Sequence, residues 1–163
     1  MKKRYCLYIQ HHYQFKNKIV LKYIQHDILH FILKNLPTDK TYLRLEHLKL
    51  GSIPNTVKTY TKLETLILSN NQLKELPQWI DSLKHLQIIG LSNNPISSIL
   101  EMVHQLPRLK CIYCSNTLIP TEERKRLRAL NIEIKDQGST QTSPKHSFTA
   151  KGSSYIVSKK RHI

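Results

Sequence analysis

The stretch LETLILSNNQL at residues 63–73 is followed, 23 residues further along the chain, by the similar stretch LQIIGLSNNPI at residues 86–96. Both fit the pattern L-x-x-L-x-L-x-x-N-x-L, with Ile in place of Leu at some positions. A fixed period of this length indicates a repeated backbone unit, and such a unit cannot bury its apolar side chains without its neighbours. The sequence therefore predicts an array of stacked repeats. The agreeing residues are Leu63, Leu66, Leu68, Asn71 and Leu73 in the first stretch and Leu86, Ile89, Leu91, Asn94 and Ile96 in the second.

Weaker copies of the pattern lie one period away on each side. The upstream copy, at residues 43–50, has Leu48 where the pattern has Asn, and the downstream copy, at residues 109–119, has Thr117 there. Degenerate outer copies are typical of the two ends of an array, where the repeats have to be capped. We therefore expect four repeats.

Over residues 41–134 the chain resembles the leucine-rich repeat family, in the 23-residue form that is common in intracellular signalling and scaffold proteins. The resemblance implies an α/β fold, a short curved solenoid with a parallel β-sheet on its concave side. It also implies a non-catalytic role, in which the concave face binds a partner protein.

Helices are predicted on both sides of the repeats. Apolar residues recur at helical spacing over residues 17–36, Asn17 is a suitable N-cap and Pro37 ends the pattern, so we expect an N-terminal cap helix. Residues 120–130 predict a C-terminal cap helix with Thr121 as its N-cap, followed by a short strand. The expected core residues are Ile28 and Phe31 in the first helix, Leu127 and Leu130 in the second, and Ile132 and Ile134 in the strand.

The predicted organisation has three parts. Residues 1–39 form the N-terminal helical cap, residues 40–135 the repeats with the C-terminal cap, and residues 136–163 a basic tail. Because residues 137–154 are rich in Ser and Thr and poor in aliphatic residues, we expect the tail to be disordered, apart from a small apolar island at Tyr155–Val157.

Three rows of residues are expected on the concave face, because side chains alternate between the two sides of a strand. Tyr42, Ile67, Ile88 and Tyr113 predict an exposed apolar patch that contacts a partner, and Gly90 predicts a shallow dent for a partner's side chain. The alternative is that these are ordinary scattered apolar surface residues. The rows are Tyr42, Thr65, Ile88 and Cys111; Arg44, Ile67, Gly90 and Tyr113; and Glu46, Ser69, Ser92 and Ser115.

The formal net charge of +15 raises a second hypothesis, in which charged termini bind nucleic acid or an anionic membrane. The excess of Lys and Arg lies mainly outside the repeats, and the three rows contain no basic stripe of the kind that grips single-stranded nucleic acid. We therefore expect a protein partner and no nucleic acid, while attraction to a membrane surface stays an alternative.

Two short motifs suggest metal or redox chemistry, but we do not expect either of them to form a metal or redox site. Cys111-x-x-Cys114 would place its cysteines on opposite sides of a strand, so both cannot easily ligate one ion. His26 and His30 share a helix face, but Asp27 replaces the Glu of the H-E-x-x-H motif and no third ligand follows. We expect no catalytic residue, no metal and no cofactor, and the reactivity of Cys111 stays open.

The chain contains three cysteines, which do not make a disulfide framework, and no apolar run long enough to span a membrane. Its N-terminus is basic, but polar residues at 10–14 interrupt the apolar region that a secretion signal needs. These features favour a monomeric cytoplasmic adaptor. An alternative with the same features is a bacterial effector that is exported into a host cell without such a signal.

Overall fold

The computed structural model describes residues 18–22, 26–136 and 155–157, and describes side chains for residues 28–136. Its sheet has seven strands in the order β6-β5-β4-β3-β2-β1-β7, and every neighbouring pair is parallel. The strands are β1 (Lys18–Lys22), β2 (Tyr42–Glu46), β3 (Thr65–Ile67), β4 (Ile88–Gly90), β5 (Cys111–Tyr113), β6 (Glu133–Lys135) and β7 (Tyr155–Val157).

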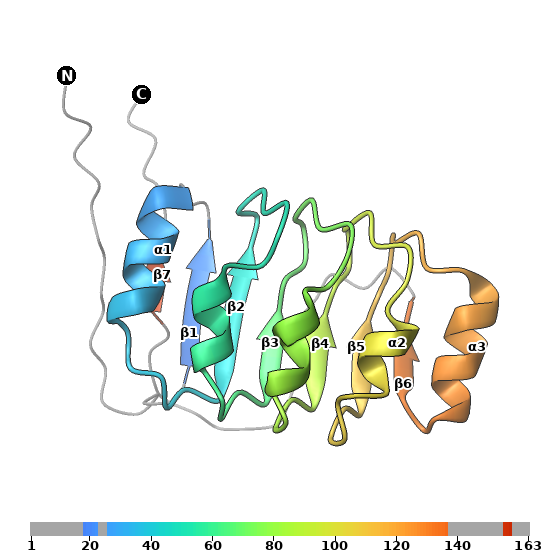
Figure 1. Cartoon of the computed structure of the whole chain (residues 1–163). Helices are drawn as coiled ribbons and strands as arrows, with labels where there is room; N and C mark the ends of the chain where they lie inside the picture. The colour runs from blue at the N-terminus through green and yellow to red at the C-terminus, as the bar shows by residue number, and fades with distance from the viewer. Residues whose placement is uncertain (1–17, 23–25, 137–154, 158–163) are drawn as a thin grey trace, which may run out of the picture.

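A helical segment follows each of the first five strands and lies on one side of the sheet (Figure 1). Pro54 and Pro77 stand directly before two of these segments, where a fixed φ and a missing N–H suit the start of a helical turn. The sheet face that points away from the helical layer is the concave face of the solenoid. The segments are α1 (His26–Asn35), the 3₁₀ turns η1 (Asn55–Thr59) and η2 (Gln78–Ser82), α2 (Leu100–Val103) and α3 (Thr121–Ala129).

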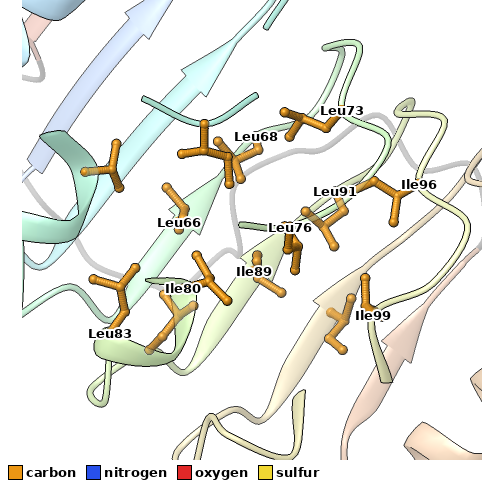
Figure 2. Close-up of a cluster of buried hydrophobic side chains, with 14 of the residues drawn as sticks. Leu66, Leu68, Leu73, Leu76, Ile80, Leu83, Ile89, Leu91, Ile96 and Ile99 are labelled. Atoms are coloured by element: carbon orange, nitrogen blue, oxygen red, sulfur yellow. The ribbon is translucent and has the colours of Figure 1, made fainter. Parts of the chain in front are cut away.

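The core lies between the sheet and the helical layer. Figure 2 shows Leu66 of β3 and Ile89 of β4 reaching into it, together with side chains from the segments that follow these strands. Leu66, Leu68 and Leu91 are completely buried, as the repeat pattern predicts. Because each unit supplies only part of this core, the stacking of units stabilises the array.

The two pattern asparagines are buried and bind the backbone of two units at once. The Asn71 Oδ1 accepts hydrogen bonds from the N–H groups of Leu48 (3.0 Å) and Leu50 (3.2 Å), and its Nδ2 donates to the carbonyl of Leu45 (2.8 Å) in the same preceding unit. One unit later, Asn94 accepts from the N–H of Leu73 (3.0 Å) and donates to the carbonyl of Leu68 (3.0 Å), both in the unit before it. The predicted role of these amides, satisfying the backbone where it leaves the strand, is confirmed.

The last repeat keeps a reduced version of this arrangement. The Thr117 Oγ1 donates to the carbonyl of Cys114 (2.8 Å), three residues upstream, as the Asn94 Nδ2 does to Leu91 (2.9 Å). A hydroxyl reaches its own unit but makes fewer bonds than an amide. Thr117 is therefore a partial substitute for the pattern asparagine.

The prediction of one helix over residues 17–36 is wrong. Residues 18–22 form β1, which pairs with β2 in register, with Ile19 opposite Leu43 and Leu21 opposite Leu45, and the helix begins only at His26. Periodicity misled because the apolar residues of a short strand and of the helix after it together mimic one helical stripe. The N-terminal part is thus a further strand–helix unit.

The helix α1 also buries residues other than those predicted. Leu29 and Leu33 are 1% exposed, whereas Ile28 is half-buried and Phe31 is 68% exposed. The carbonyl of Leu33 lacks its helical donor, since Pro37 four residues later has no N–H, and the buried hydroxyl of Tyr60 donates to it instead (2.7 Å). Tyr60 thereby ties α1 to the following unit.

At the other end, the predicted helix and strand are present as α3 and β6, but two details are wrong. Leu127 is buried, whereas Leu130 is 43% exposed. Pro120, and not Thr121, precedes the first helical residue, and no side chain caps that end. The Glu123 side chain of α3 bonds the start of a different helix, α2. Its Oε1 accepts hydrogen bonds from the N–H groups of Ile99 (2.6 Å) and Leu100 (2.9 Å).

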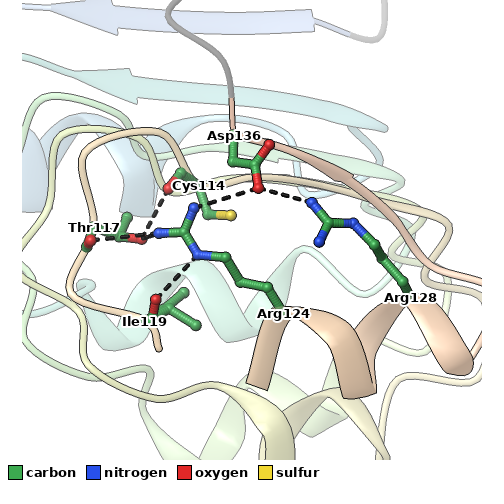
Figure 3. A network of polar contacts seen from close by, with 6 residues as sticks. All are labelled: Cys114, Thr117, Ile119, Arg124, Arg128 and Asp136. Atoms are coloured by element: carbon green, nitrogen blue, oxygen red, sulfur yellow. Dashed lines mark hydrogen bonds and ion pairs between the residues drawn. The ribbon is translucent and has the colours of Figure 1, made fainter. Parts of the chain in front are cut away.

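A polar network joins α3 to the end of β6 (Figure 3). Arg124 donates to the carbonyl of Ile119 (3.0 Å) and to the Oγ1 of Thr117 (3.2 Å), and its guanidinium lies 3.5 Å from the Asp136 carboxylate. Arg128 donates to the same carboxylate oxygen (2.7 Å). These contacts fasten α3 against the last described unit.

The predicted disordered tail lies mostly outside the described residues, but its apolar island forms β7. None of the helices in the described part of the chain is long and apolar enough to cross a membrane.

Candidate protein-binding face

The concave face is built from residues that alternate with the buried leucines along the strands. Tyr42, Thr65, Ile88 and Cys111 lie opposite one another in the strand register and form a first row. Arg44, Ile67, Gly90 and Tyr113 form the second row. The strand register thus confirms the predicted placement of both rows. The prediction was possible because the register follows from the 23-residue period. Glu46, Ser69, Ser92 and Ser115 follow in the third row.

The exposure predicted for the centre of this face is partly wrong. Ile67 is 7% exposed, because its side chain lies over Gly90 of the next strand, where an added Cβ would come within 3.0 Å of the Ile67 Cδ1. The dent expected at Gly90 is therefore filled by the chain itself. In the third row Glu46, Ser69 and Ser92 are buried as well.

The first row keeps a partly exposed apolar centre. Ile88 is half-buried, Thr65 beside it is half-buried, and the covered pair of Ile67 and Gly90 continues this floor in the second row. Tyr42 on β2 and Tyr113 on β5, both half-buried, stand on the two sides of the floor.

At the β2 side of the floor, Tyr42 belongs to a small charged group. The Arg44 Nε donates to the Glu46 carboxylate at 2.6 Å, and the Arg44 side chain is only 17% exposed. Burial by itself lowers the pKa of Arg44, but the hydrogen bond with Glu46, the Glu46 charge and the interaction with Tyr42 together outweigh it and raise the pKa above its usual value. Burial also raises the pKa of Tyr42, so this phenol stays neutral at physiological pH.

At the β5 side, Tyr113 belongs to a similar group that the sequence analysis missed. The ammonium of Lys135 lies 5.2 Å from the centre of the Tyr113 ring and 3.2 Å from the Glu133 carboxylate. Both charged residues are on β6, which continues the two rows with Glu133 opposite Cys111 and Lys135 opposite Tyr113. The alternation around Ile134 was the signal for these positions, but the spacing from β5 to β6 differs from the period by one residue.

The two cysteines of the C-x-x-C motif lie on opposite sides of β5, as predicted. Cys111 is on the concave face and 6% exposed, whereas Cys114 is completely buried in the apolar core. Burial, reinforced by the nearby Glu133 carboxylate, raises the pKa of the Cys111 thiol to about 11. The thiolate needed for metal binding or nucleophilic attack is therefore disfavoured at neutral pH.

The second candidate metal motif has one side chain in the described part of the chain. His30 is exposed on α1, and the His26 side chain lies outside the described side chains. Among the described residues, no three His, Cys, Asp or Glu side chains form a group that could hold a metal ion.

Comparisons with known proteins agree with this architecture. Residues 61–102 match the family model described as leucine rich repeats in two copies. Among solved structures, a leucine-rich repeat protein of Leptospira interrogans is 32% identical to this chain, with a TM-score of 0.53. The match covers 61% of this chain and 28% of that one, so this chain spans less than a third of that protein's length. No curated protein matches the chain. The predicted repeat family and α/β solenoid are confirmed, whereas the capping role of the end helices stays a prediction.

Proposed function

We propose that this leucine-rich repeat protein is a non-catalytic protein-recognition module that binds its partner on the concave face. Leucine-rich repeat domains generally bind proteins. The binding role of the individual residues is our inference from the composition of the face.

The observation that supports the proposal most is the arrangement of Tyr42 and Tyr113 around the floor of Thr65 and Ile88. Tyrosines offer large contact areas at low cost in side-chain entropy, and they are enriched in protein interfaces. Half-buried tyrosines beside a half-buried isoleucine can exclude water from a partner's side chain when that side chain rests on Ile88.

The charges on this face also define the kind of partner. The Arg44 guanidinium already bonds Glu46, and the Lys135 ammonium already contacts Glu133 and the Tyr113 ring. A nucleic acid would have to break these contacts to reach a cation, whereas a neutral apolar segment would leave them intact. We therefore propose that the partner presents an uncharged loop with an exposed apolar or aromatic side chain.

The test compares two variants that each add one carboxylate. Ile88→Glu places it in the floor, and Gln78→Glu places it on the exposed side of η2, away from the concave face. Partners captured by the wild-type chain would be purified, and their affinities measured by calorimetry. Ile88→Glu should weaken binding at least tenfold, about 1.4 kcal/mol, and Gln78→Glu should change it less than twofold.

Equal affinities of the two variants would contradict the placement of the site. The salt dependence separates the remaining alternative, because binding through phosphates weakens steeply as salt rises. Little change in affinity between roughly 50 and 200 mM salt supports an apolar contact. A loss of a hundredfold or more in that range, with nucleic acid or anionic lipid as the ligand, would instead support binding through the basic ends.

The cellular setting is a further part of the proposal. We propose a monomeric cytoplasmic adaptor, with delivery of the chain into a host cell as the alternative. If the tail carries a delivery signal, deleting residues 140–163 from a reporter fusion should abolish its translocation. Normal delivery of the shortened fusion would show that the tail does not carry the delivery signal.

A further inference from the structure

The outer side of β1 is covered by the carboxyl-terminal strand of the same chain, which is the edge strand at this end of the sheet. The strand β7 pairs with β1 in parallel, with Tyr155 opposite Ile19 and Val157 opposite Leu21, at the far end of the sheet from β6 (Figure 1). The segment at residues 137–154 joins β6 to β7. Its extended reach of roughly 60 Å exceeds the roughly 30 Å across the intervening strands, so one chain can make this pairing.

This closure is short compared with the edge that it covers. All five residues of β1 pair with β2, but only three pair with β7. An uncovered edge strand presents N–H and C=O groups in a row that another strand can use. At the opposite edge, β6 pairs with β5 alone among the strands that the structure describes.

The two edges have matching registers. Through the successive pairings, Lys18 and Glu133 belong to the row of Tyr42, Ile19 and Ile134 to the row of Leu43, and Val20 and Lys135 to the row of Arg44. If β6 of a second copy were laid beside β1 in the same register, apolar positions would meet in the core row. A glutamate would then neighbour a lysine in the first row, which is favourable between adjacent strands.

One exposed position of the helical layer is apolar in the first unit and polar in the next three. The Trp79 indole donates a hydrogen bond to the Asn55 side chain of the preceding unit (2.9 Å), so the Trp79 side chain extends toward the amino-terminal end of the array. Ile32 is the residue of α1 that corresponds to Trp79. Phe31 is exposed where the other units have polar residues. Those polar residues are Asn55, Gln78 and Glu101.

Exposed apolar residues gather at the two ends of the array. Among the described residues, the exposed large hydrophobic side chains are Phe31 (68%), Leu118 (66%) and Leu130 (43%), in the first and last units.

We propose that the outer edge of β1 is a self-association site for β6 of a second copy, and that β7 keeps this site closed. Contact between the two different edges is head-to-tail, so copies that associate in this way form an open chain or a ring and not a symmetric dimer. Because β7 is tethered, its effective concentration at β1 is in the millimolar range, which keeps dilute protein monomeric.

The first test compares two truncations of the full chain. Removing residues 155–163 deletes β7, whereas removing residues 158–163 leaves it in place and serves as the matched control. The mass in solution would be measured by light scattering from roughly 10 to 300 µM protein, with circular dichroism to confirm folding. The variant without β7 should at least double its mean mass over this range, and the control and the full chain should stay monomeric.

The second test identifies the edges. In the variant without β7, Glu133→Lys should reduce association at least fivefold, because it would place a second lysine at the register position next to Lys18. Adding Lys18→Glu should restore association. The proposal is overturned if the folded variant without β7 stays monomeric throughout the range. It is also overturned if that variant associates equally with and without Glu133→Lys, since association would then not use these edges.

Discussion

Replacing Asn94 by Ala is expected to be among the most damaging single changes in the array. Its side chain is 1% exposed. The Oδ1 accepts from the N–H of Leu73 (3.0 Å), and the Nδ2 donates to the carbonyls of Leu68 (3.0 Å) and Leu91 (2.9 Å). Alanine leaves all three backbone groups without this partner, in a site from which water is largely excluded. At about 1 to 1.5 kcal/mol for each bond, the free energy of unfolding should fall by about 3 to 5 kcal/mol.

The matched control is the neighbouring residue. Asn93 is exposed, has a φ of 57°, and shares side-chain hydrogen bonds with Asn70 (3.0 Å) and Asn116 (2.8 Å). Asn93→Gly removes a similar amide while keeping the left-handed backbone conformation, so its cost should be under about 1 kcal/mol. Asn94→Thr should fall between the two variants, because a hydroxyl can keep the bond that Thr117 makes in the last repeat.

The assay is urea unfolding followed by the fluorescence of Trp79, the single tryptophan of the chain. The free energy of each variant comes from the midpoint and the slope of the transition, and an unchanged slope shows that the same structure unfolds. Equal losses for Asn94→Ala and Asn93→Gly would refute the reasoning, since burial of the amide would then not decide its contribution.

Three further results are expected. Tyr60→Phe should lower the free energy of unfolding by about 1 to 2 kcal/mol in the same assay, because the carbonyl of Leu33 loses its donor; an unchanged value would contradict that tie. Partial desolvation opposes ionisation of Asp136, but the hydrogen bond from Arg128 and the positive charges of Arg128 and Arg124 together outweigh it, so the pKa of this carboxyl lies below its usual value. Its stabilisation should be complete above the unfolded-state pKa and be lost as the pH falls through the lower native pKa. Asp136→Asn should therefore flatten the fall of the urea midpoint between about pH 5 and 3, and an unchanged fall would contradict this. The Cys111 thiol, with its pKa near 11, should resist iodoacetamide at pH 7.5 until urea unfolds the chain, as read by peptide mass spectrometry; rapid labelling of the folded protein would contradict its burial.

Several features of the binding face follow from the repeat pattern. Because the strand register advances by one period, the alignment of Tyr42, Thr65, Ile88 and Cys111 in one row could be predicted from the sequence. The pattern also gave the buried side of each strand, since side chains alternate. The opposite orientations of the two C-x-x-C cysteines follow from the same rule.

Exposure within that face could not be predicted in this way. Whether Ile67 is available to a partner depends on its neighbour one strand away, where Gly90 leaves room for the isoleucine to lie down. Ile88, in the adjacent row, has no glycine beside it in the register and stays partly exposed. Whether a residue of the concave face is buried thus depends on the neighbouring unit as well as on its own.

By itself, the sequence determined the repeat unit, the order of the strands β2 to β5 and the asparagines that hold the turns. All of these depend on contacts between residues that are close in the chain or one period apart, and such contacts recur visibly in the pattern. The tertiary structure alone decided that residues 18–22 form a strand and that β7 lies beside them. The pairing of β1 with β7 lacks a repeated signal, because strands at the two ends of the chain meet only after the array between them has folded and set the distance that they must bridge.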